Sequence, residues 1–434
     1  MSISSVYHQP THQAPNIHQN QALEQDGGYS DCDGGYPAEQ AAAPEPIVFN
    51  ALSGPGDGPE GYHHNGPYPN VDQFISTDGG RTTLRNSFFS RYFSHATTTW
   101  GYNIIQTIGN HFGRFSVQRL GSGVNSSAFV MQEEGTQRKH VLRTFSVRNL
   151  RHEHHQKAFQ LSRDHVGGEW TSGTFNHPNL ASNTHLVVWD SADNSFRVMD
   201  QNQVQHLIAN RHTMQPGRQL YAVATIAEYV EGSQDLDRYL SENPQRSEEE
   251  IRDILQGTLQ GVAEMNRHQT IHRDLKAANI IRLPTGETQL IDFGSVGLQN
   301  QDEDLPFFGD RCVHPIDSFY KISGIEPHTN KKTDTYSLFL VTYQAITGRK
   351  FFGANSNNPQ EIKLQHRALI EKERATNNFQ TILDEDPLLK NVSQPLKNLM
   401  AQLGTASEKR RLTAEEALTH PFFAPREIEQ LQVA

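Results

Sequence analysis

The chain has 434 residues, a length that suggests two or three domain-sized units, and a formal net charge of −11. Residues 1–80 contain ten Asp and Glu and no Lys or Arg, so they carry −10 of this charge and the remainder is nearly neutral. A nearly neutral remainder argues against nucleic-acid binding, which needs a basic footprint. No apolar run approaches the ~20 residues that span a bilayer. Two cysteines, Cys32 and Cys312, are too few for a disulfide framework and indicate a reducing, cytoplasmic compartment.

The amino-terminal segment 1–86 is rich in Gln, His, Gly and Pro and has neither a helical nor a strand period, which predicts a disordered tail. It shows neither the basic start nor the apolar core of a secretory signal. Its uncharged, Ser- and Gln-rich beginning resembles the export signals of bacterial effectors delivered into host cells. Export into a host cell and a plain disordered leader therefore both stay open. The pair His63-His64 fits a solvated polar tract or a metal-binding one.

An aromatic-rich lead-in follows at 87–112, for which helix and strand are both open. Residues 115–120 then alternate like a strand, and a second strand resumes at 129–131. The turn between these strands contains Gly121, Ser122 and Gly123. Two glycines at such a turn let backbone amides approach a phosphate, although a plain hairpin turn is the alternative.

Farther along, a long helix is predicted from Ser247. Serine is a preferred helix cap, and the three glutamates after it complement the helix dipole. Apolar residues follow at helical spacing, which is the pattern of a core-facing helix, at Ile251, Ile254, Leu255, Leu259, Val262 and Met265.

The stretch 271–294 carries the chemistry. It contains the run His272-Arg273-Asp274-Leu275-Lys276-Ala277-Ala278-Asn279, a Pro-Thr-Gly turn, and Asp292-Phe293-Gly294. Phosphoryl transfer from ATP needs a carboxylate to accept the proton of the attacking hydroxyl, and oxygen ligands to hold Mg²⁺. Asp274 fits the first role, and Asn279 and Asp292 fit the second. A hairpin between the two segments would bring them together.

This stretch resembles the catalytic and metal-binding loops of eukaryotic-type protein kinases. The sequence resembles the family again at 332–338 and at 409–423. In all, the resemblance covers about residues 113–424. It implies an α+β, two-lobed fold with a small β-rich lobe and a larger helical lobe, followed by a short tail at 425–434. It also implies ATP and Mg²⁺ as cofactors and protein substrates as partners.

By this resemblance Lys276 contacts the γ-phosphate, and Arg273 beside the base receives a phosphate from the activation segment, which leaves autophosphorylation open. Ala227 occupies the gatekeeper position behind the adenine. The residues implied to bind the nucleotide are Gly121, Ser122, Gly123, Ala128, Val141, Arg143, Glu169, Glu228, Val230 and Ile281.

The chain departs from the family pattern at several places. Ser126 replaces the third glycine, and Arg143 stands where the family has its strand-three lysine, a change that is not conservative at a phosphate site. Glu169 is the candidate helix glutamate, with a surface carboxylate as the alternative, and Gly167-Gly168 would weaken a helix there. Residues 185–219 are longer than the family hairpin and predict an inserted strand pair and loop. Of the family's A-P-E motif only Glu326 is a weak candidate.

The sequence therefore predicts a Ser/Thr protein kinase, since Lys276 two places after the base is the Ser/Thr form. Two alternatives remain. The first is a pseudokinase scaffold that binds nucleotide or partner proteins without efficient catalysis. Arg143 in place of the family's lysine supports this alternative. The second is a kinase-like phosphotransferase that acts on a small molecule.

Overall fold

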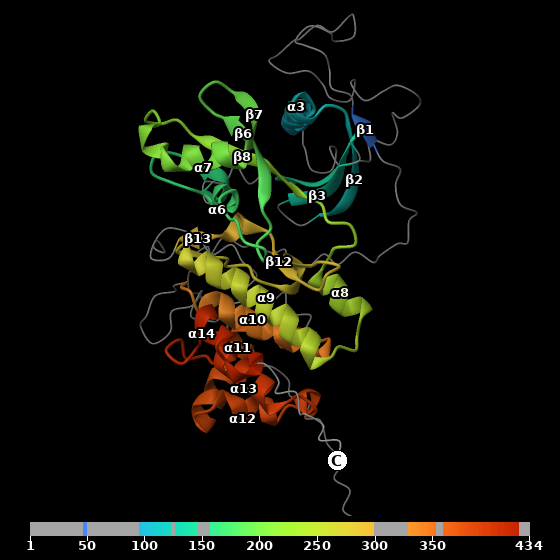
Figure 1. The fold of residues 1–434 in the computed structure, drawn as a ribbon. Coiled ribbons are helices and arrows are strands. Elements are labelled where there is room, and N and C mark those ends of the chain that lie inside the picture. The colour runs from blue at the N-terminus through green and yellow to red at the C-terminus, as the bar shows by residue number, and fades with distance from the viewer. Residues whose placement is uncertain are drawn as a thin grey trace, which may run out of the picture. The chain divides into compact units, whose positions relative to one another are not determined.

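The computed structural model describes the residues 47–49, 95–122, 126–136, 138–145, 157–298, 329–352 and 359–424. These residues form a β-rich amino-terminal part and a helical carboxy-terminal part, which confirms the predicted α+β organisation (Figure 1). Within the described ranges no helix is both long and apolar enough to cross a membrane.

The amino-terminal part is built around one antiparallel sheet, which has eight strands in the described residues. Its order is β1-β2-β3-β4-β8-β6-β7, and β5 pairs with β8 off this path. The strands are β1 (Ile47–Phe49), β2 (Phe115–Ser122), β3 (Ser126–Glu133), β4 (Lys139–Phe145), β5 (Gln160–Leu161), β6 (Asn183–Asp190), β7 (Ser195–Asp200) and β8 (Leu220–Glu228).

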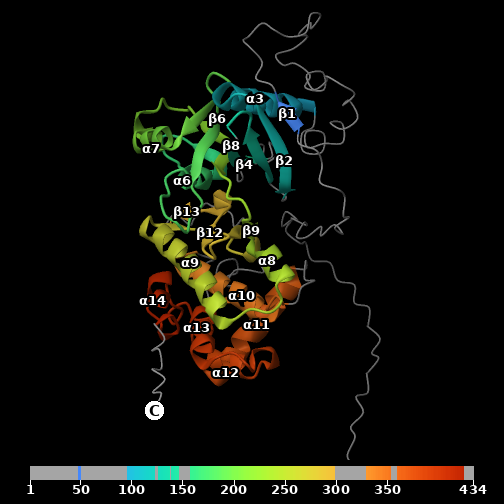
Figure 2. The same cartoon turned by 45° about the vertical axis from the view of Figure 1, so that its right-hand side comes forward.

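One face of this sheet is covered by helix α3 (His95–Phe112), as Figure 2 shows. Ile104 and Ile108 of α3 are buried in the same cluster as Phe129 of β3 and Val187 of β6. The lead-in segment is therefore helical from His95 onward, and Ile104 and Ile108 belong to the core of the sheet.

The opposite face carries the insertion that follows β6. Strand residues alternate between faces, so Leu186 and Val188 point to this side while Val187 points to α3. They pack with Trp170 of the short helix α6 (Gly168–Ser172) and with Val204 of α7 (Gln201–Ala209). A 3₁₀ turn, η2 (Arg211–Thr213), follows α7.

This insertion differs from the predicted strand pair and loop. It contains one added strand, β7, and the helix α7, which Asp200 and Gln203 cap reciprocally at its first turn. The spacing of Asp200 and Gln203 is a capping-box pattern that marks a helix start in the sequence.

Strand β1 lies within the segment 1–86 that was predicted to be disordered. Its backbone pairs antiparallel with β2, with Ile47 opposite Val117 and Phe49 opposite Phe115. Ile-Val-Phe is a run of strand-favouring residues, which accounts for the local exception. The remainder of 1–86 lies outside the described residues.

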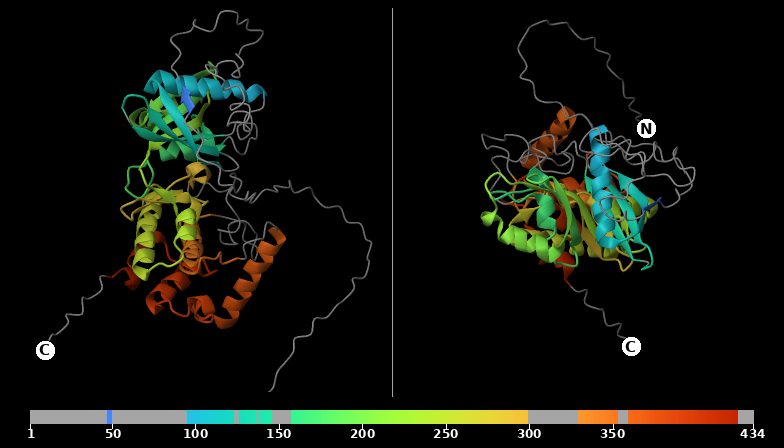
Figure 3. Two further views of the ribbon diagram at one scale, coloured as in Figure 1. Left: turned by 90° about the vertical axis from the view of Figure 1, so that its right-hand side faces the viewer. Right: turned by 90° about the horizontal axis from the view of Figure 1, so that it is seen from above.

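The carboxy-terminal part is mainly helical, and Figure 3 gives two further views of its helices. The predicted helix is present as α9, whose cap Ser247 accepts a hydrogen bond from the Glu250 amide at 3.2 Å. All six of its predicted apolar positions are buried. The helices are α8 (Leu236–Glu242), α9 (Glu248–Arg267), α10 (Thr333–Thr347), α11 (Pro359–Thr376), α12 (Phe379–Asp384), α13 (Gln394–Gly404) and α14 (Ala414–Leu418), with 3₁₀ turns η7 (Pro387–Leu389) and η8 (Pro421–Phe423).

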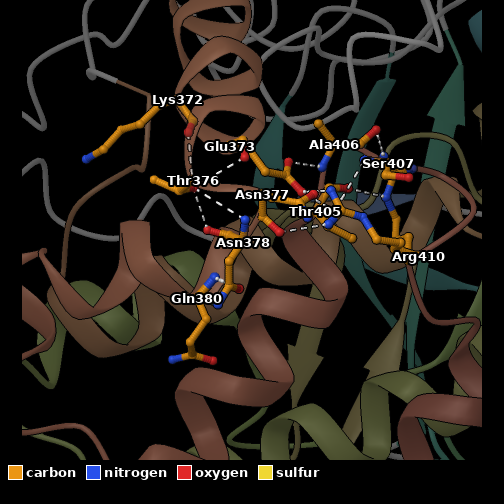
Figure 4. A network of polar contacts seen from close by, with 11 residues as sticks. Lys372, Glu373, Thr376, Asn377, Asn378, Gln380, Thr405, Ala406, Ser407 and Arg410 are labelled. Atoms are coloured by element: carbon orange, nitrogen blue, oxygen red, sulfur yellow. Dashed lines mark hydrogen bonds and ion pairs between the residues drawn. The ribbon is translucent and has the colours of Figure 1, made fainter.

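A buried acid fixes the turn between α13 and α14 (Figure 4). Glu373 of α11 accepts hydrogen bonds from the Ala406 amide and from Arg410, both at 2.8 Å, and from the Thr405 hydroxyl. The same turn holds Arg411, which is buried, donates to the Thr405 carbonyl at 3.1 Å and faces the ring of Tyr336. Glu326, the weak candidate for the glutamate of the family's A-P-E motif, lies outside the described residues.

Candidate active site

The catalytic stretch is framed by two small sheets. Strand β10 (Thr270–Ile271) pairs with β13 (Gly297–Leu298), and β11 (Ile280–Arg282) lies between β12 (Thr288–Leu290) and β9 (Gln234–Asp235). The β11–β12 hairpin turns through Gly286 at a φ of 94°, a value that glycine adopts without strain. The predicted hairpin is thus present, and it sets residues 272–279 beside residues 291–295.

Asp334, at the start of α10, holds the backbone that leads to Asp274. Its two carboxylate oxygens accept hydrogen bonds from the amides of His272 at 2.8 Å and Arg273 at 3.0 Å. Arg273 has a φ of 61°, in the left-handed region that costs a side-chain-bearing residue energy. Burial raises the pKa of Asp334, while the nearby His272 and the two amides act against that rise.

Asp274 lies among polar partners in the turn that includes η3 (Ala277–Asn279). Its Oδ2 is 3.1 Å from Lys276 Nζ and accepts a hydrogen bond from Asn279 Nδ2 at 3.0 Å. The same amide nitrogen donates to the Asp274 carbonyl at 2.7 Å. Three residues expected to act on one phosphoryl group are therefore in direct contact.

His272 and Phe293 connect this turn to Asp292. The His272 ring nitrogen Nε2 donates to the Ile291 carbonyl at 2.9 Å, and the ring lies 5.8 Å from that of Phe293. Phe293 also packs against Phe175, with ring centroids 5.2 Å apart. Asp292 precedes the 3₁₀ turn η4 (Phe293–Ser295) and has a φ of 65°.

Arg143 on β4 joins Asp292 to Glu169. Its Nη2 lies 2.5 Å from Asp292 Oδ1, and its Nη1 lies 3.2 Å from Glu169 Oε1. Its Nε donates to the Ser126 hydroxyl at 3.1 Å. Burial lowers the pKa of Arg143, but the charges of Asp292 and Glu169 outweigh burial and leave this pKa above its ordinary value.

The two carboxylates respond differently to the shared arginine. Burial raises the pKa of Glu169 to about 7, more than Arg143 lowers it, and Oε2 has no hydrogen-bond partner among the described residues. Burial also acts to raise the pKa of Asp292, but Arg143 and then Lys276 bring it below its usual value. Asp292 is thus the carboxylate that stays ionised under ordinary conditions.

Glu169 is placed by the short helix α6, which begins where the backbones of Gly167 and Gly168 lie close to other segments. A Cβ on Gly167 would lie 2.4 Å from the Lys157 carbonyl oxygen, and one on Gly168 would lie 2.3 Å from that of Phe293. No helix runs through both glycines, since α6 begins at Gly168, and their lack of a side chain allows α6 to begin against these backbones. Val204 of α7 packs on the far end, 2.9 Å from a Cβ built on Gly173.

The residues expected around the nucleotide lie on neighbouring strands. Ala128 pairs with Arg143 and Gly121, and Val141 pairs with Ala227 next to Glu228 at the end of β8. Val230 follows β8 and is exposed, and Ile281 lies on β11 opposite Gln289. Ser122 ends β2. Gly123 lies outside the described residues, as do residues 299–328, which contain most of the activation segment.

The donor set fits a hard divalent cation. Such cations prefer carboxylate and amide oxygens, and Asp292 supplies an ionised carboxylate. The amide nitrogen of Asn279 is occupied by Asp274, which assigns Oδ1 as the atom that a cation would take. Asn279 and Asp292 are linked by the hydrogen bond from the Ile291 amide to the Asn279 carbonyl at 3.0 Å.

Several residues that support this site could not be predicted to do so from the sequence. Asp334 lies in the segment 332–338, which resembles the family, but its hydrogen bond to Arg273 joins residues 61 apart in the chain. Asn179 donates to the Thr288 carbonyl at 2.8 Å and so anchors β12. Phe175 supports Phe293. Only for Asp334 was there a signal, an acid at the start of an otherwise apolar helix.

Known proteins resemble the chain over this region. The family model described as protein kinase domain matches residues 174–423, which is more than half of the chain. Protein kinase kin1 of Schizosaccharomyces pombe is 23% identical over 197 residues, 45% of this chain and 20% of that protein. Serine/threonine-protein kinase tousled-like 1 of Caenorhabditis elegans is 29% identical over 221 residues, 48% and 21% respectively. Myosin light chain kinase 2 of Rattus norvegicus is 26% identical over 208 residues, which are 46% of this chain and 31% of that protein.

These matches span a fifth to a third of each relative. Asp274, Lys276, Asn279 and Asp292 fall inside the region matched by the family model. Arg143 and Glu169 precede it, so their arrangement is known from the structure alone.

Proposed function

The chain belongs to the protein kinase family, and on this premise we propose that it transfers the γ-phosphate of ATP, with Mg²⁺, to Ser and Thr hydroxyls of protein substrates. The environment of Asp274 carries the proposal. Its Oδ2 has Lys276 Nζ at 3.1 Å and Asn279 Nδ2 at 3.0 Å, so the carboxylate is oriented from two sides. A lysine two residues after the base supports Ser/Thr specificity, since this is the Ser/Thr form of the loop.

Each residue has one role in this proposal. Asp274 orients the attacking hydroxyl and accepts its proton. Lys276 offsets negative charge on the transferred group, and Asn279 and Asp292 hold the cation. When bound, Mg²⁺ supplies charge neutralisation on the phosphates. Arg273, whose Nε donates to the Ser295 carbonyl at 2.7 Å, links the base to the start of the activation segment.

The nucleotide is proposed to lie against the face shared by Ala128, Val141 and Arg143. Period-two alternation puts Val141 and Arg143 on the same side of β4, and the register sets Ala128 beside Arg143. The backbone of Glu228 and Val230 would bind adenine, with Ile281 below it. Gly121 and Ser122 would bring backbone amides to the phosphates, and Glu169 would hold Arg143.

A pseudokinase scaffold is the second candidate, and one observation favours it. Arg143 Nη2 lies 2.5 Å from Asp292 Oδ1, so the guanidinium of Arg143 already occupies one oxygen of the proposed metal ligand. A cation bound at Asp292 would have to take the other oxygen, Oδ2, or displace Arg143 from Oδ1. A scaffold has no such requirement.

Phosphoryl transfer to the protein itself and to a generic protein substrate tests the proposal. Asp274→Asn keeps the shape of the side chain and removes the charge that accepts the proton. We expect a rate loss of at least about a hundredfold with nearly unchanged ATP affinity, because the base acts on the hydroxyl. Asp253→Asn, on the exposed side of α9, is the matched control and should transfer phosphate normally.

Three results would decide between the candidates. Wild-type protein as inactive as Asp274→Asn under both Mg²⁺ and Mn²⁺, but still binding ATP, would support the scaffold. Phosphotyrosine as the main product would overturn Ser/Thr specificity. Transfer that survives Asp274→Asn unchanged would remove Asp274 as the base.

A further inference from the structure

The two departures from the family pattern in the amino-terminal part touch each other. Ser126 stands at the third glycine position and Arg143 at the lysine position. Ser126 lies on β3 opposite Phe145, and Arg143 lies two residues earlier on β4, so the two are diagonal neighbours on adjacent strands. The Ser126 hydroxyl accepts a hydrogen bond from Arg143 Nε at 3.1 Å.

The donor atom of this bond, Nε, is present in arginine and absent from lysine. Counted from the backbone, the Nε of arginine stands where lysine has its last methylene carbon, which cannot donate a hydrogen bond. A lysine at this position would leave the Ser126 hydroxyl without this donor. The Ser126 hydroxyl therefore finds a donor in arginine at position 143 and would not find this donor in the family's lysine.

The rest of the guanidinium is also held. Its centre lies 5.0 Å from the ring of Phe145, within cation–π distance. Nη1 reaches Glu169 and Nη2 reaches Asp292, at 3.2 and 2.5 Å. Because the guanidinium is planar and rigid, fixing Nε also fixes the direction of both terminal nitrogens. The bond to Ser126 thus sets how the fork meets its two carboxylates.

We propose that Ser126 is a positioning residue for Arg143, and that the pair together replaces the family's glycine and lysine in holding the nucleotide phosphates. This inference rests on the proposed kinase function. On this proposal the guanidinium of Arg143 holds the phosphates, and its partner Ser126 is the first residue of β3, directly after the glycine-rich turn.

A double-mutant cycle tests this pairing. It compares wild type, Ser126→Ala, Arg143→Lys and the double variant, with the affinity for ATP, the KM for ATP and kcat measured for each. We expect Ser126→Ala to weaken ATP affinity and raise the KM about fivefold in wild type, the order of one hydrogen bond, and to have no effect in the Arg143→Lys background. Ser126→Thr keeps the hydroxyl and should restore wild-type affinity.

Ser127→Ala is the matched control, since the neighbouring serine points to the other face of β3 and is buried. It should affect both backgrounds equally. Equal effects of Ser126→Ala in the two backgrounds would overturn the inference. Coupling in ATP affinity without any phosphoryl transfer by wild type would reject the kinase function and retain the positioning role.

Discussion

Asp334 Oδ1 accepts a hydrogen bond from the Arg273 amide at 3.0 Å, so the start of α10 holds the strained residue next to the proposed base. The other oxygen accepts from His272. Both acceptors are needed, because an amide in place of the carboxylate would turn an N–H toward one of the two backbone N–H groups.

Asp334→Asn should therefore destabilise the protein by about 2 kcal/mol, the cost of one buried group left without its partner. It should also slow phosphoryl transfer more than it weakens ATP binding, since Arg273 precedes Asp274. Urea unfolding and steady-state kinetics would measure the two effects. The control Asp237→Asn, exposed and bonded to Gln344, should change stability by less than about 0.5 kcal/mol. Equal stability of the two variants would contradict the assigned role.

His366 on α11 should make the protein sensitive to acid. Burial lowers the pKa of His366 to about 3, and its ring lies 4.2 Å from that of Phe352. Between pH 6.5 and about 3 the unfolded chain binds a proton that the folded protein does not. Stability from this group is therefore complete above pH 6.5 and is lost progressively as the pH falls.

At pH 5 this loss amounts to about 2 kcal/mol relative to neutral pH. His366→Phe keeps an aromatic ring and should lack this component, whereas the exposed His206→Asn should retain it. Urea unfolding at pH 7.5 and pH 5 compares the three proteins. The same acid-induced loss in wild type and His366→Phe would show that the group titrates normally in the folded state.

Ala227 should leave room behind the adenine for a bulky substituent. It is half-buried at the end of β8, between Val141 on β4 and Asn183 on β6. Buried apolar area contributes about 25 cal/mol per Å², so a purine analogue with a benzyl-sized group should gain about 2 kcal/mol, roughly thirtyfold in affinity. Ala227→Met should abolish that gain and spare ATP. Competition binding to both proteins measures it, and equal affinities would place another side chain in the space.

Strand β1 limits how much of the amino-terminal segment can be removed without cost. Deleting residues 1–46 should leave the melting temperature unchanged, because segments without a core make few contacts. Deleting residues 1–50 also removes the pairing of Ile47 and Phe49 with β2 and should cost about 1–3 kcal/mol, a few degrees in Tm. Identical melting of the two truncations would show that β1 contributes nothing to stability.

Local sequence patterns were sufficient to predict the elements that depend mainly on neighbouring residues. The helix from Ser247 followed from its cap and apolar period, and the turn that carries Asp274 followed from a motif within one segment. The inserted helix α7 had a local signal too, in Asp200 and Gln203, but the insertion was predicted from its length alone, as a strand pair and loop.

Contacts between distant segments could not be predicted in the same way. The bond from Arg143 to Asp292 joins residues 149 apart, and its geometry depends on where β4 and the hairpin end up in space. Glu169 could be proposed as the helix glutamate, but the short α6 could not be predicted, because glycines break helices in isolation and here permit close packing.

Gly168 lets two backbones of the site lie close together. A methyl group on Gly168 would lie 2.3 Å from the Phe293 carbonyl oxygen, so any side chain at position 168 would force α6 away from residue 293. Glu169 and Asp292 adjoin these two residues in the chain, and Arg143 bonds both carboxylates. We therefore expect a compound that pushes α6 outward to disturb the proposed nucleotide contact and the proposed cation ligand at one and the same dose.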